Sequence, residues 1–181
     1  MVSAPVPGIV SDARAHRRRA WLELRLFEVL GGWVATTDDP EARIALATGC
    51  RRHEWHARLW RDLVPVIGGP VDQAAAPTPA WVAVVDAVAA APTTIERLAG
   101  FARVVLAHLI TTDDARLAVA SPVADAPLRR VLGLVLADDV EEWRTGEALL
   151  RRLVVDRSTM DAAVAHQARV EHLLLDARAS A

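Results

Sequence analysis

Two histidines, His53 and His56, lie three residues apart in the stretch CRRHEWHARLW at residues 50–60. On a helix of about 3.6 residues per turn, positions three apart lie on the same face. Imidazole is a ligand for iron, zinc, copper and nickel, and a buried imidazole also forms hydrogen bonds with carboxylates. The pair therefore predicts a metal site or a buried polar network, provided that it faces the interior.

The residues around the pair indicate which way it faces. Glu54, Arg58 and Arg61 fall on one side of a helix drawn at about 100° per residue. The histidines fall on the other side, on a stripe that also contains Ala42, Ala45, Leu46, Gly49, Trp60 and Leu63. We therefore expect both histidines to be buried.

Carboxylates interrupt the apolar stripes of other predicted helices. Asp139 and Glu142, again three residues apart, lie on a stripe of mainly apolar residues, and Glu23 lies at the edge of another. His108 lies at one flank of the stripe of a further helix. A buried charge without a partner costs several kcal/mol, so these groups should meet. Counting from the predicted turns at about 1.5 Å per residue places them at similar height.

Capping and breaking signals divide the chain into helices. Asp39-Pro40 and the stretch TTIE at residues 93–96 are typical of helix N-termini, and prolines at 65–79 exclude a regular helix there. The predicted helices span about residues 11–37, 40–64, 80–91, 93–120, 125–155 and 158–178. Residues 1–10 are expected to be a flexible arm, and 11–179 one all-α domain with a crossover linker at about 65–93. His166 and His172, on the last helix, are expected at the surface.

Composition excludes several classes of function. The 181 residues are 52% hydrophobic, enough for a sizeable core, and a net charge of −2 gives no strong field for nucleic acid. One cysteine and no apolar leader predict a cytoplasmic protein. No apolar run approaches the roughly 20 residues of a membrane span, so no membrane partner is expected.

These features resemble the ferritin-like superfamily. Its di-iron members carry an inward glutamate on each of two helices and an inward Glu-x-x-His motif on each of the other two. Over about residues 11–155, Glu23 matches the first-helix glutamate, and His53-Glu-Trp-His56 stands at the first motif with His53 replacing glutamate. Asp139-Val-Glu-Glu142 stands at the second motif with Glu142 replacing histidine. The third-helix glutamate has no equivalent unless His108 substitutes.

The resemblance implies a four-helix bundle with one long crossover and an additional C-terminal helix. It also implies iron or another divalent metal, held by Glu23, His53, His56, His108, Asp139 and Glu142, and a metal-dependent oxidase or oxygenase activity on a small substrate. The alternative is a metal-free bundle that serves as a binding or assembly module through Trp55 and Trp143, which project away from the stripes. Under both interpretations we expect the protein to form a homo-oligomer.

Overall fold

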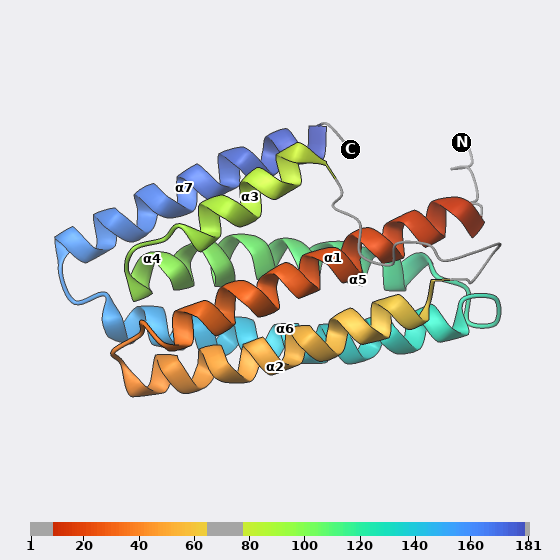
Figure 1. Cartoon of the computed structure of the whole chain (residues 1–181), viewed down its shortest axis with the longest axis horizontal. Helices are drawn as coiled ribbons and strands as arrows, with labels where there is room; N and C mark the ends of the chain where they lie inside the picture. Colours follow the sequence, from red (N-terminus) through yellow and green to blue (C-terminus); the bar gives the residue numbers. More distant parts are fainter. Residues whose placement is uncertain (1–8, 65–77, 180–181) are drawn as a thin grey trace.

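The computed structural model describes residues 9–64 and 78–179, which form helices joined by short connecting segments. No strand occurs in these two ranges, which confirms the all-α prediction. The predicted arm lies mostly outside them, as do residues 65–77 of the crossover linker predicted at about 65–93. The segments are α1 (Ile9–Val34), α2 (Pro40–Asp62), α3 (Pro79–Ala89), α4 (Thr94–Leu98), η1 (Ala99–Leu106), α5 (Ala107–Val119), α6 (Ala126–Leu153) and α7 (Arg157–Ala179) (Figure 1).

Local capping sets several helix ends close to where the sequence predicts them. Asp39 caps α2 by accepting a hydrogen bond of 2.8 Å from the backbone N–H of Ala42, with Pro40 in the first turn. Thr78 and Thr93 cap α3 and α4 in the same manner. The start of α1 differs from the prediction, because the helix begins at Ile9 and takes in the last residues assigned to the arm.

The third long segment is not the uninterrupted α-helix that the sequence predicts over 93–120. Between α4 and α5 the chain is wound as a π-helix, η1, whose hydrogen bonds run from residue i to i+5. All of its residues are buried except Arg103, which is partly exposed. The wider winding changes which face each later residue of this segment presents. Such turns are rare and are found frequently at functional sites.

The long segments lie side by side and enclose the core. α1 packs along α2, α2 along α6, and α6 along η1 and α5. After α2, helix α3 carries the chain back along the molecule, so that α4 begins near the end where α2 begins (Figure 1). None of the helices in the described ranges is both long and apolar enough to cross a membrane.

α7 packs against α3, α4 and η1 (Figure 1). Trp55 of α2 and Trp143 of α6 are both exposed. The prediction that His166 is a surface residue is wrong, since only 6% of it is exposed. Gly100 makes this burial feasible, because a Cβ at that position would lie 2.8 Å from His166 Nε2. His172, farther along α7, is exposed as predicted.

Candidate metal centre

Five of the six residues predicted to be ligands come together in the interior. Glu23 comes from α1, His53 and His56 from α2, and Asp139 and Glu142 from α6. The side chains of all five are buried, and the most exposed of them, Glu142, is only 8% exposed. The inward direction predicted from the apolar stripes of α2 and α6 is therefore confirmed.

One carboxylate oxygen of Glu23 faces both histidines. Its Oε2 atom lies 2.5 Å from His53 Nδ1 and 3.7 Å from His56 Nδ1. One donor atom from each of the three residues lies within 4.8 Å of the others. Because bonds of about 2.1 Å to a metal place neighbouring ligand atoms about 3–4 Å apart, a single ion fits this set after small side-chain adjustments.

Two carboxylates of α6 also approach the histidines, Asp139 near the Nδ1 atom of His56 and Glu142 near the Nε2 atom of His53, on the side of that ring away from Glu23. Asp139 Oδ1 lies 3.7 Å from His56 Nδ1, and Glu142 Oε2 lies 3.6 Å from His53 Nε2. His56 Nδ1, Asp139 Oδ1, His53 Nε2 and Glu142 Oε2 all lack a hydrogen-bond partner among the described residues. Buried polar atoms are normally satisfied, so a bound proton or cation would compensate these atoms.

The sequence prediction missed Asp138, which orients His56. The Nε2 atom of His56 lies 3.1 Å from Asp138 Oδ2, at the partly exposed edge of the cluster. When Nε2 donates its proton to this carboxylate, the lone pair of Nδ1 is directed toward Glu23 and Asp139. Histidines that bind metals usually have such a carboxylate or carbonyl partner on the second nitrogen.

Arg19 and Asp113 were also missed, and both belong to the cluster. Arg19 Nε lies 2.8 Å from Glu23 Oε1, and its Nη2 atom lies 3.0 Å from Asp113 Oδ2 and 3.4 Å from Asp139 Oδ2. The guanidinium is buried. Sequence spacing contained signals for both residues, since Arg19 precedes Glu23 by one helical turn and Asp113 follows the buried Leu109 by one turn.

His108 lies outside this group. Its ring packs against Trp81 with 5.4 Å between centroids, and it lines a second pocket of about 250 Å³ beside Arg19 and Asp113. Burial, with the positive charges of Arg178 and Arg19, lowers the pKa of His108 to about 4. The winding of η1 accounts for the difference from the prediction, because it turns Asp113 toward Arg19 in place of His108.

The electrostatics of the cluster favour an added positive charge at the histidines. Burial lowers the pKa of His53, but the carboxylates of Glu142 and Glu23 outweigh it and raise the pKa to about 9. Burial and the charge of Glu23 raise the pKa of Asp139 to about 7, against the effect of Arg19. A proton or a metal cation at the imidazoles relieves the same excess of negative charge.

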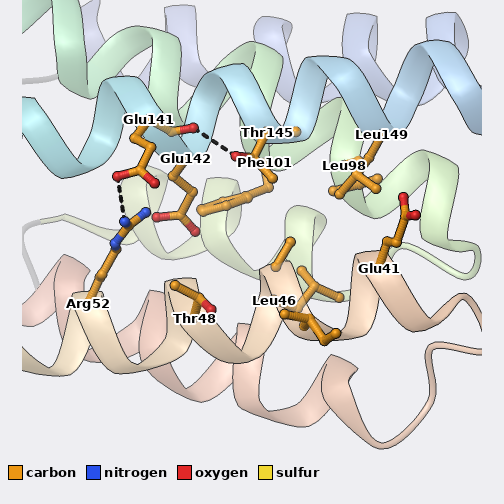
Figure 2. A pocket seen from close by; sticks show the side chains of 13 residues that line it. Glu41, Leu46, Thr48, Arg52, Leu98, Phe101, Glu141, Glu142, Thr145 and Leu149 are labelled. Carbon is orange, nitrogen blue, oxygen red and sulfur yellow. Dashed lines mark hydrogen bonds and ion pairs between the residues drawn. The ribbon is translucent and has the colours of Figure 1, made fainter.

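A pocket of about 290 Å³ lies beside the cluster between α2 and α6 (Figure 2). Its walls are largely apolar, with Leu46, Phe101 and Leu149 among them. Glu142 also lines the pocket, and Figure 2 shows its carboxylate pointing from α6 toward α2 beside Phe101. Since the same carboxylate approaches His53, Glu142 connects the pocket to the cluster.

Comparison with known proteins gives no relative for this chain. No protein-family model matches it, and neither a curated protein nor a solved structure matches it at a significant level. What the protein does is therefore inferred from the cluster and the pocket.

Proposed function

We propose that this protein is a divergent ferritin-like, metal-dependent oxidase or oxygenase that acts on a small, largely apolar substrate. One observation carries the proposal: Glu23, His53 and His56 present buried donor atoms within 4.8 Å of one another. Two histidines and one carboxylate with open coordination positions are typical of non-haem Fe(II) oxygenases. Iron held there would supply the oxygen chemistry, which protein side chains do not supply themselves.

The residues of the cluster divide into those that hold the ion and those that position them. Glu23, His53 and His56 would be the ligands, and Asp139 would be a further donor beside His56. Asp138 holds the proton of His56 on Nε2, which keeps Nδ1 available. Glu142 lines the pocket and approaches His53 Nε2, so it would contact both a substrate in the pocket and a histidine of the centre.

The pocket supports a small substrate with an apolar body. Its volume of about 290 Å³ lies just below the usual range for ligand sites, which suits a small molecule. Apolar walls favour a hydrocarbon or aromatic group, and Phe101 packs edge-on against His53 with 5.7 Å between ring centroids. Among the polar residues that line the pocket, Arg52 is paired with Glu141 at 2.7 Å (Figure 2).

The order of the helices supports the ferritin-like part of the proposal. The hairpin of α1 and α2 contributes Glu23 and the histidine pair, while the third segment and α6 contribute Asp113 and the second pair of carboxylates. A crossover that contains α3 joins the two halves (Figure 1). In this interpretation α7 is the additional C-terminal helix.

Metal analysis of the purified, untagged protein tests the proposal. After anaerobic reconstitution with ferrous iron, we expect stoichiometric metal in the wild type and none in His53→Ala, with weakened retention in Glu142→Ala. His172→Ala, on the exposed side of α7, is the matched control and should retain metal. Oxygen consumption with small aromatic substrates is then measured. Failure of the wild type to hold iron, zinc or manganese overturns the proposal.

A metal-free binding or assembly module is the second candidate, and Arg19 is the observation that favours it. Its guanidinium already gives Glu23, Asp113 and Asp139 a cationic partner. Trp55 and Trp143 are 40% and 37% exposed and offer apolar contact area for a partner or a second copy. Absence of metal together with self-association in sedimentation, lost in a Trp55→Ala, Trp143→Ala variant, would support this module.

A further inference from the structure

Glu23 and Asp139 each use their two oxygens on two different neighbours. Glu23 places Oε1 at 2.8 Å from Arg19 Nε and Oε2 beside the histidines. Asp139 places Oδ2 at 3.4 Å from Arg19 Nη2 and Oδ1 at 3.7 Å from His56 Nδ1. Both carboxylates therefore bridge the guanidinium and the position proposed for the ion, as bridging carboxylates do between two metal ions.

We infer that Arg19 takes the place of a second metal cation, and that the centre binds one divalent ion per chain. The inference rests on the proposed function, since it specifies the occupancy of the same centre. A third carboxylate, Asp113, lies on the guanidinium side, with its Oδ2 atom 3.0 Å from Arg19 Nη2. The cluster is thus divided into an arginine half, held by α1, α5 and α6, and a histidine half, held by α1, α2 and α6.

A second ion between Glu23, Asp113 and Asp139 has no place while Arg19 is present. It would have to displace a buried guanidinium from three carboxylates, and a buried charge deprived of its partners is strongly destabilising. The guanidinium also cannot give up its charge by losing a proton, because arginine remains protonated in proteins. Arg19 therefore limits the centre to one ion, whereas a neutral or titratable side chain at this position would not.

Counting the ions bound by the full-length, metal-free protein tests this inference. Co²⁺ is titrated under anaerobic conditions, with visible absorption and equilibrium dialysis as readouts. We expect one ion per chain in the wild type and two in Arg19→Met, where oxygens of Glu23, Asp113 and Asp139 become available to metal. Arg116→Met is the matched control, because Arg116 lies 5.6 Å from the Trp60 ring as Arg19 does, and it should bind one ion.

The outcomes separate this inference from the proposed function. Two ions in the wild type, or one in a folded Arg19→Met variant, overturn the role given to Arg19 and leave the metal centre standing. No ion in the wild type overturns both. If Arg19→Met does not fold, the wild type is loaded with Mn²⁺: an uncoupled electron paramagnetic resonance spectrum at saturation supports a single ion, and a spin-coupled spectrum overturns it.

Discussion

The carboxylate of Glu142 occupies the space that a side chain at position 49 would fill. A Cβ built on Gly49 would lie 1.8 Å from Glu142 Oε1 and 2.8 Å from its Cδ atom. Leu30 closes the same space from α1, with its Cδ1 atom 3.2 Å from that Cβ. Glycine on α2 thus allows a carboxylate of α6 to come within 3.6 Å of His53 Nε2.

Replacing this glycine should therefore disturb the metal centre from a position that bears no ligand. We expect Gly49→Ala to push the Glu142 carboxylate toward the pocket and to weaken Co²⁺ binding by about 10-fold or more, as loss of a supporting group does. Gly133→Ala on α6 is the control, because a Cβ there meets nothing within 4 Å. It should leave binding unchanged and add up to about 1 kcal/mol of stability. Equal affinities in the two variants would contradict the steric argument.

The carboxylate of Asp138, which pairs with His56 Nε2, should affect the metal affinity of the centre. In Asp138→Asn the amide no longer holds the proton on Nε2 of His56 as a carboxylate does. We expect the affinity for Co²⁺ to fall about 10- to 100-fold, with the helical circular-dichroism signal retained. Glu141→Gln removes a nearby carboxylate that pairs with Arg52 at the surface, and its affinity should match the wild type. A similar loss of Co²⁺ affinity in both variants would show that the nearby negative charge matters, and not the hydrogen bond to His56.

The metal-free protein should lose stability as the pH rises from 7 to 9. The folded-state pKa of His53 is about 9, above the ordinary value of 6.5. Its contribution to stability is therefore complete below pH 6.5 and is lost as the pH rises through 9, which amounts to about 2 kcal/mol between pH 7 and 9. The pKa of Asp139 is raised to about 7, so this carboxyl group also lowers the stability of the protein as the pH rises, but over a lower pH range.

Urea unfolding in the presence of a chelator measures this loss. In His53→Gln the decline between pH 7 and 9 should be smaller by most of that amount, because the titrating imidazole is gone. His172→Gln, whose ring is 78% exposed, should decline as the wild type does. A decline of the same size in His53→Gln would show that other groups titrate in this range.

The pocket should admit small apolar molecules independently of the metal. Thr48 is exposed and lines the pocket (Figure 2), so Thr48→Trp is expected to fill the space without removing a core residue. Binding of phenol, followed by the shifts of the Leu46 and Leu149 methyl resonances, should weaken at least 10-fold in this variant. Its Co²⁺ affinity should be unchanged. Unaltered phenol binding would exclude this pocket as the substrate site.

The pattern of the sequence determined the helices and the inward direction of most of the site. Caps such as Asp39 and Thr93 act through adjacent residues, so they can be recognised without knowledge of the fold. The apolar stripes of α2 and α6 likewise predicted that His53, His56, Asp139 and Glu142 are buried, because a regular helix repeats its faces at a known period.

Only the tertiary structure decided which of the inward residues meet. A stripe indicates that a residue is buried, but its partner lies on another helix whose rotation and height depend on packing. Arg19 shows this, since it joins Glu23 to Asp113 and Asp139 from two helices far away in the sequence. The π-helical turns of η1 changed the faces of the third segment, and for that physical reason Asp113 belongs to the cluster whereas His108 does not.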